Sequence, residues 1–220
     1  MNDFELTQRR VMGVLVILLP IIPILFGFLG DNNPPCWWYS ISDTYYTNSV
    51  AVMVGIISIA SFFFCTYKGY DWRDRLVNLV SGIGLLGLLI FPITSQGFDK
   101  VGLFCLPAKV SGFIHCIFAF TAFTGFFFNL EFLFTLSSGK KTKRKKIRNV
   151  IYIVCGSTVI LALVIIVLGK LGIGTKNMVW IAETISLIPC GFAWLVKGKM
   201  FKCLNDEDTQ NKKSHNFRRF

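Results

Sequence analysis

Two ionisable residues, His115 and Glu183, interrupt long apolar stretches of this 220-residue chain. A charged group within a membrane span is costly unless it is paired or hydrated, so each such residue is a candidate functional group. An imidazole can accept a proton, and a carboxylate can orient that imidazole or bind a cation. We expect the two side chains to lie at one depth and to pair with each other.

A polar segment between Tyr39 and Ser49, YSISDTYYTNS, brings hydroxyl groups and a carboxylate to the edge of an apolar stretch. Ser40 or Ser42 could act as a nucleophile with His115 as its base, and such a site would act on a lipid ester or an acyl chain. No nucleophile-elbow motif accompanies these serines. The sequence therefore assigns no catalytic residue, and it leaves open whether the chain is an enzyme.

The same segment can instead contribute to a ligand-binding site. Asp43, His115 and Glu183 would line a polar cavity in the outer half of the molecule, with phenylalanine-rich walls. Tyr45 and Trp38 would add cation–π contacts to a cationic ligand. A purely structural interpretation is also open, in which Asp43 caps the following helix and the aromatic residues form an interfacial belt.

Two of the seven cysteines fall in the expected outer loops. We predict a disulfide between Cys36 and Cys105, because both loops would face a compartment that can be oxidising. The chain has only two histidines, and no Cys-x-x-Cys motif or cysteine–histidine spacing indicates zinc. We therefore predict neither a metal site nor a cofactor.

Six apolar blocks must position these groups, and each is close to the about 20 residues that cross a bilayer. Only 16% of the residues are charged, whereas a soluble domain carries about 25%. The blocks do not alternate as barrel strands do. We therefore predict an all-α integral membrane protein, a bundle of six transmembrane helices in residues 1–198. The expected spans are about 11–30, 47–67, 75–96, 109–136, 148–170 and 177–197.

The distribution of positive charge predicts the orientation, because lysine and arginine collect in cytoplasmic loops. With the N-terminus inside, only four of the 23 basic residues fall outside, so both termini are expected to be cytoplasmic. Residues 199–220 then form a basic cytoplasmic tail. The stretch GKKTKRKKIR, residues 139–148, is expected to meet anionic lipid headgroups and no nucleic acid, since it lacks interleaved aromatic residues. The plasma membrane is favoured over an endomembrane, and a homo-oligomer is left open.

Two expectations concern the packing of the spans. Gly82, Gly84 and Gly87 in the stretch SGIGLLG should let neighbouring helices approach closely. Near the cytoplasmic side, Glu131 is expected to pair with a basic residue at its level, such as Arg148.

Several short motifs occur in a suggestive order. ISDT at residues 41–44 follows the first outer loop, a histidine stands in the outer half of the fourth span, and a glutamate stands early in the sixth span, which CGFAWLVKG closes. This order resembles the DRAM/Frag/Sfk group of six-span membrane proteins, and the chain is also similar to uncharacterised bacterial polytopic membrane proteins. The resemblance implies a membrane protein, with lipid handling in some members. It carries over Ser42, Asp43, His115 and Glu183 as site residues.

Three functions stay open on this basis. The first is the binding or movement of a lipid or a small, possibly cationic, amphiphile in the outer half of the bundle. The second is an intramembrane lipid hydrolase or acyltransferase that uses serine, histidine and acid residues. The third is a non-catalytic scaffold or regulatory subunit that docks through its basic inner face.

Overall fold

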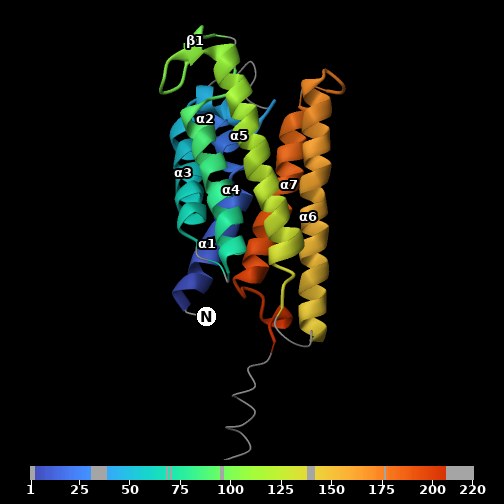
Figure 1. The fold of residues 1–220 in the computed structure, drawn as a ribbon. Coiled ribbons are helices and arrows are strands. Elements are labelled where there is room, and N and C mark those ends of the chain that lie inside the picture. The colour runs from blue at the N-terminus through green and yellow to red at the C-terminus, as the bar shows by residue number, and fades with distance from the viewer. Residues whose placement is uncertain are drawn as a thin grey trace, which may run out of the picture.

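The computed structural model describes residues 3–30, 39–67, 69, 71–94, 97–137, 142–175 and 177–206. The described chain is a bundle of helices that run roughly side by side (Figure 1), which confirms the all-α class. Its helices are α1 (Asp3–Leu18), α2 (Ile22–Gly30), α3 (Val50–Thr66), α4 (Trp72–Ile90), α5 (Ala108–Phe128), α6 (Lys143–Lys170) and α7 (Met178–Lys197). The shorter elements are the 3₁₀ helices η1 (Ile41–Tyr46) and η3 (Lys202–Leu204), the π-helical η2 (Asn129–Leu133), and the strands β1 (Lys100–Val101) and β2 (Leu106–Pro107).

Three helical segments are long and apolar enough to cross a membrane: Ala108–Leu133, which joins α5 to η2, and then α6 and α7. The helix α3 is apolar but shorter. Large apolar side chains are widely exposed on the bundle, and Phe62 and Val150 are 73% and 60% exposed. Such a surface suits contact with lipid rather than water. The structure is therefore compatible with an integral membrane protein.

The first predicted span, 11–30, is wrong as a single helix. The helix α1 ends at Leu18, and α2 begins at Ile22 after a turn at residues 19–21. Pro20 causes this break, because proline has no backbone N–H and its ring clashes with the preceding turn. Pro23 lies in the first turn of α2, where proline is tolerated.

The other predicted spans are helical, with shifted ends. The helix α4 ends at Ile90 rather than near 96, because Pro92 disfavours the helical conformation at Phe91. The helix α6 begins at Lys143 rather than near 148, since the Thr142 hydroxyl caps it by accepting from the Lys145 N–H at 3.0 Å.

A short antiparallel hairpin, which the sequence did not predict, joins α4 to α5. Its strands β1 and β2 pair Lys100 with Pro107, and Gly102 in the turn has a φ of 76°, which favours glycine. We call this end of the molecule the hairpin end. The opposite end, where α6 begins and α7 ends, is called the basic end (Figure 1).

Glycines bring the helices into close contact, as predicted for Gly82, Gly84 and Gly87. A Cβ atom on Gly84 would lie 2.8 Å from the backbone nitrogen of Ala122, so α4 and α5 touch through their main chains. A second contact of this kind, which was not predicted, joins α1 to α7. A Cβ on Gly13 would lie 2.7 Å from the carbonyl oxygen of Gly191.

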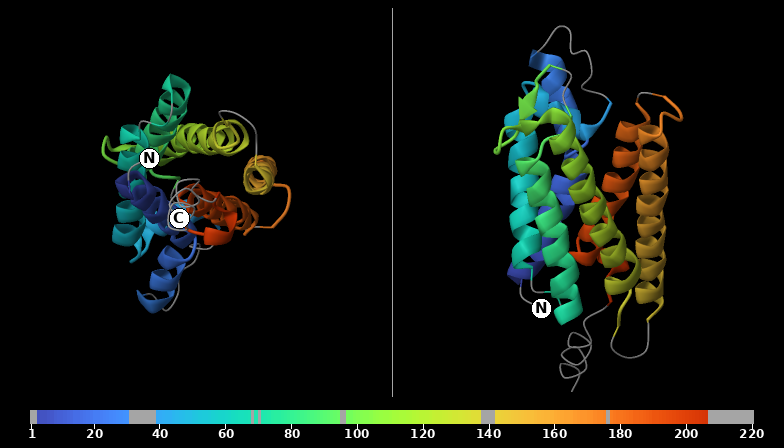
Figure 2. Two further views of the ribbon diagram at one scale, coloured as in Figure 1. Left: turned by 90° about the horizontal axis from the view of Figure 1, so that it is seen from below. Right: turned by 45° about the horizontal axis from the view of Figure 1, so that its top comes forward.

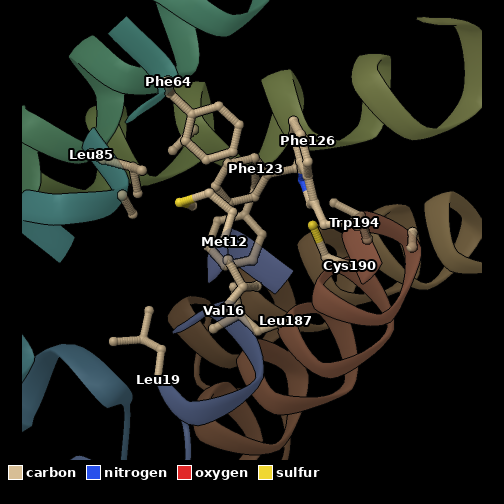
Figure 3. Close-up of a cluster of buried hydrophobic side chains, with 14 of the residues drawn as sticks. Met12, Val16, Leu19, Phe64, Leu85, Phe123, Phe126, Leu187, Cys190 and Trp194 are labelled. Atoms are coloured by element: carbon tan, nitrogen blue, oxygen red, sulfur yellow. The ribbon is translucent and has the colours of Figure 1, made fainter. Parts of the chain in front are cut away.

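The core lies where α1, α3, α5 and α7 meet (Figure 3). Trp194 of α7 is fully buried at its centre. The Trp194 ring packs edge-to-face against Phe64 and Phe134, with centroid distances of 5.5 and 4.9 Å. This rigid core fixes the positions of the helices that carry the polar residues. The helix α6 stands at its margin, beside α7 (Figure 2, left).

The segment that follows α7 folds back onto the start of α6. The Arg148 guanidinium forms a salt bridge to the Asp206 carboxylate at 2.7 Å, and the Thr142 hydroxyl donates to the same carboxylate. The predicted pairing of Glu131 with Arg148 is therefore wrong. Glu131 instead accepts from the Ser157 hydroxyl at 3.3 Å, because its position on η2 directs it toward the middle of α6.

Candidate functional site

The polar segment after Tyr39 forms the 3₁₀ helix η1 rather than the first turn of a long span. Ser40 caps this helix, since its hydroxyl accepts from the Asp43 N–H at 3.2 Å and donates to the Asp43 carboxylate at 2.9 Å. The open structural interpretation, in which Ser42 or Asp43 caps the following long helix, is wrong, because Ser40 caps the short helix η1 instead. The helix α3 begins later, after Ser49, which makes no side-chain cap.

His115 connects α5 to both η1 and the end of α4. Its Nε2 atom lies 2.9 Å from the Ser42 hydroxyl, and its Nδ1 atom lies 2.8 Å from the Phe91 carbonyl oxygen. Because a carbonyl oxygen only accepts, Nδ1 carries a hydrogen, and Nε2 of the neutral ring then accepts from the Ser42 O–H. The imidazole is buried, with 5% exposed. Its orientation is thus set from both sides.

Glu183 holds the other side of η1. Its Oε2 atom accepts from the Ile41 N–H at 2.6 Å, and one turn earlier in α7 the Trp180 N–H donates to the Tyr39 carbonyl at 3.0 Å. No hydrogen bond joins His115 to Glu183 within the described chain, so the predicted pairing of the two is wrong. Each side chain bonds to η1 instead, and η1 is held between α5 and α7.

Lys170, at the exposed end of α6, is a further charged residue near this region that was not among the predicted site residues. Its positive charge acts electrostatically on Asp43, His115 and Glu183. Burial raises the pKa of Asp43 above its ordinary 3.8, and the Ser40 hydrogen bonds and the Lys170 charge only partly oppose that rise. The only sequence signal for Lys170 was its position among the few basic residues expected outside.

The aromatic residues of η1 face different surroundings. The Tyr46 hydroxyl donates to the Ile93 carbonyl at 2.5 Å, and burial with the nearby Tyr45 and Asp43 raises the pKa of Tyr46 to about 12. Tyr45 is half-buried against the core and packs edge-to-face on Tyr46 at 5.3 Å. Tyr45 therefore does not form an open aromatic wall. Trp38 lies outside the described residues.

The predicted disulfide stays a prediction. Cys105 is exposed in the turn of the hairpin, and Cys36 lies outside the described residues.

An apolar groove with a volume of about 440 Å³ lies between α5 and α6. Phe120, Thr124 and Phe127 line it from α5, and Leu163, Val164 and Leu168 are among its α6 residues. Among the described residues that line it, Thr124 is the polar one, and the Thr124 hydroxyl is itself buried. Along α6 the lining of the groove extends to Leu168, two residues before Lys170.

The phenylalanine-rich walls that the sequence predicted do not surround one cavity. Phe120 lines the groove, whereas Phe123 is buried in the core. Phe118 stacks on Phe91 at 5.7 Å, and Phe113 is 68% exposed. These side chains point in different directions because the helical repeat distributes them around α5.

The arrangement around η1 can do two kinds of chemistry. A serine hydroxyl bonded to an oriented imidazole is the minimal arrangement of a nucleophile and its base. Two carboxyl groups and the Lys170 ammonium group can bind the polar end of an amphiphile. The chain matches no protein-family model, no curated protein and no solved structure.

Proposed function

We propose that this chain is a six-span membrane protein that binds or moves a lipid-like amphiphile. The α5–α6 groove carries the proposal, because its lining is apolar and it lies between two helices that are long enough to span a membrane. Its volume of about 440 Å³ falls in the range of about 300–1,000 Å³ that is typical of ligand pockets.

Three further spans complete the proposed topology. The helices α3 and α4 have 17 and 19 residues, and at about 1.5 Å per residue each approaches the hydrocarbon thickness of about 30 Å. The broken pair α1 and α2 forms the first span. Both termini are cytoplasmic in this proposal, and the membrane is the plasma membrane. We also propose that the resemblance to the DRAM/Frag/Sfk group reflects a family relationship.

The proposed ligand has a hydrocarbon chain in the groove and a headgroup near η1. Asp43 and Glu183 supply carboxyl groups there, and Lys170 supplies positive charge. A headgroup with both an anionic group for Lys170 and a hydrogen-bond donor for the carboxyl groups suits this region, whereas the sequence alone left a cationic group as one option. Such a division between an apolar chain and a polar end is how pockets fix the orientation of amphiphiles.

Bound lipid, measured by native mass spectrometry on the detergent-purified chain, tests this proposal. Val164→Trp fills the groove, and Leu161→Trp adds the same bulk at an exposed α6 position that does not line it. We expect the wild type and Leu161→Trp to retain one defined amphiphile and Val164→Trp to lose it. Equal retention by all three proteins, or only mixed lipid in the wild type, would overturn the groove as a binding site.

A second candidate, an intramembrane lipid hydrolase or acyltransferase, rests on the 2.9 Å contact between Ser42 and His115. In this reaction the Ser42 oxygen attacks the ester carbonyl while His115 Nε2 takes the hydroxyl proton. The ester C–O bond then breaks, the imidazolium gives that proton to the departing alcohol, and water or an acceptor alcohol releases the acyl group from Ser42. The Phe91 carbonyl holds the ring in the required tautomer. Asp43 and Glu183 do not bond to the imidazole. The group that orients the base is therefore a backbone carbonyl rather than the carboxylate of a usual catalytic triad.

Ser40 offers a matched control for this second candidate, since its hydroxyl bonds to Asp43 rather than to a histidine. Hydrolysis of p-nitrophenyl butyrate and covalent labelling by a fluorophosphonate would be measured on both alanine variants. An enzyme predicts that Ser42→Ala loses turnover and labelling while Ser40→Ala keeps them. Absence of turnover and labelling in the wild type would remove the candidate.

A further inference from the structure

A carboxyl group stands where the α5–α6 groove ends on the side of the basic end. Glu131 of η2 follows Phe128, which lines the groove from α5, by three residues. On the facing helix, Ser157 precedes Ile160, which lines the groove from α6, also by three. Residues three apart are neighbours on a helix surface, so both side chains continue the lining by one turn. Glu131 Oε1 accepts from the Ser157 hydroxyl at 3.3 Å, which joins the two helices across this end.

The local structure makes room for this carboxyl group. A Cβ on Gly156 would lie 2.8 Å from both Cγ and Oε1 of Glu131, so a larger residue would push the carboxyl group away from α6. Glu131 belongs to the π-helical η2, and single π-helical turns within helices are frequent at functional sites. Figures 1 and 2 show α5 approaching α6 near this end and diverging from it toward the hairpin end. The carboxyl group is therefore held where the two helices come together.

The hydrogen-bonding capacity of the Glu131 carboxyl group is largely unused. The Ser157 hydroxyl has one hydrogen, and it shares this hydrogen with the closer Ile153 carbonyl oxygen at 2.9 Å. Within the described chain, no lysine, arginine or histidine forms an ion pair with Glu131. Along α6, Ser157 lies nine residues beyond Arg148, about 14 Å farther into the proposed span. An ionisable group inside a span is costly without a partner, so a partner from outside the chain would stabilise it.

We propose that Glu131 binds a hydroxyl group at the far end of the amphiphile's chain, so that the ligand is a long-chain molecule with a polar group at each end. This inference rests on the proposed function, because the chain occupies the same groove. A plain hydrocarbon end would leave the carboxyl group unpaired, whereas a terminal hydroxyl donates a hydrogen bond to it.

The two ends of the groove set the length of this ligand. The headgroup lies toward Lys170, which follows the lining residue Leu168 by two positions. The terminal hydroxyl lies at Glu131, beside Ser157. Ser157 and Lys170 are 13 residues apart, or about 20 Å along the α6 axis. The two polar groups of the ligand are therefore separated by an extended chain of about that length.

Competition between two fatty acids tests the proposal. 16-Hydroxyhexadecanoic acid and hexadecanoic acid have the same chain and the same carboxylate, and only the first carries a terminal hydroxyl. Both acids are offered in equal amounts to the detergent-purified full chain, and native mass spectrometry separates the two complexes by mass. We expect the wild type to prefer the hydroxylated acid. Glu131→Leu keeps apolar bulk but removes the acceptor, so it should lose about tenfold of that preference.

Glu5→Leu is the matched control, because it removes the same charge from an exposed position on α1 that does not line the groove. It should keep the wild-type preference. Glu131→Gln keeps a carbonyl oxygen but loses the charge, so its preference should fall by about threefold. This variant decides the outcome if Glu131→Leu does not elute as a single folded species in size exclusion.

The outcomes separate this inference from the proposed function. Equal binding of the two acids by the wild type, with loss of both in Val164→Trp, would overturn the terminal hydroxyl and leave the groove as the binding site. A preference that persists in Glu131→Leu, or that Glu5→Leu loses equally, would also overturn it. Binding of neither acid by a wild type that still carries a defined amphiphile would overturn this inference alone. Binding of neither acid by a wild type that carries only mixed lipid would overturn both.

Discussion

At the scale of single residues, the partners of His115 and Glu183 decide how the polar region works. His115 is oriented by a carbonyl and a hydroxyl, and Glu183 accepts from a backbone N–H. Both side chains therefore bind the chain itself and fasten η1, in addition to any role toward a ligand. Substitutions must separate the structural role of each group from its charge.

Glu183 allows that separation. Glu183→Ala leaves the Ile41 N–H without its acceptor, and we expect a loss of about 1–3 kcal/mol in the free energy of unfolding. Glu183→Gln keeps a carbonyl oxygen in the same place, so its loss should be much smaller. Thermal unfolding in detergent measures both variants. Equal losses would show that the negative charge, rather than the hydrogen bond, is what the fold requires.

Asp43 predicts a dependence on pH. Its pKa is raised above the ordinary 3.8 by burial, so the folded protein binds the proton more tightly than the unfolded chain does. Its favourable contribution is then fully present below 3.8 and is lost as the pH rises through the raised pKa. We expect Asp43→Asn to unfold at a higher temperature than the wild type at neutral pH, with the difference disappearing in acid. A difference that instead grew in acid would contradict the assigned direction of the shift.

At the scale of elements, close backbone contacts define the bundle. The contact of Gly84 with Ala122 leaves no space for a side chain, whereas a Cβ on Gly55 would meet nothing within 4 Å. We expect Gly84→Ala to destabilise the protein by about 1–3 kcal/mol through overpacking. Gly55→Ala should be neutral or stabilise α3 by up to about 1 kcal/mol, because alanine favours helices. Melting temperatures of the two variants, measured side by side, check this contrast.

The sequence predicted the elements better than their boundaries. Long apolar blocks specify helices, and the small residues of α4 already indicated a close neighbour. The break at Pro20, the hairpin and the π-helical η2 depend on short local signals that an average over 20 residues conceals. The fold-back of residues 202–206 onto α6 carried no periodic signal, because individual hydrogen bonds donated by Thr142, Arg144 and Arg148 hold it in place.

At the scale of the whole molecule, the proposed topology places the two ends of the bundle on opposite sides of the membrane. Cys105 and Cys203 are exposed at the hairpin end and the basic end. In a Cys36→Ala background, we expect an impermeant maleimide to label Cys105 on intact cells and Cys203 only after permeabilisation. A cysteine introduced by Glu5→Cys should behave like Cys203. Labelling of the position-5 cysteine on intact cells would exclude six spans with a cytoplasmic N-terminus.

The same reagent tests the predicted disulfide. If Cys36 and Cys105 are bonded, Cys105 in the wild type will react only after reduction, whereas in Cys36→Ala it will react without reduction. Equal labelling in both proteins before reduction would contradict the disulfide.

The sequence by itself determined the helical class, the apolar lengths of the segments and the residues worth examining. These properties are local, because hydropathy and helix-breaking residues act within one segment. Only the tertiary structure decided which atoms those residues meet. It separated His115 from Glu183, brought both to η1, and added Lys170 to their surroundings. It also brought Lys145 and Lys197 to one backbone carbonyl, because partners far apart in the sequence are selected by helix packing, which no local pattern records.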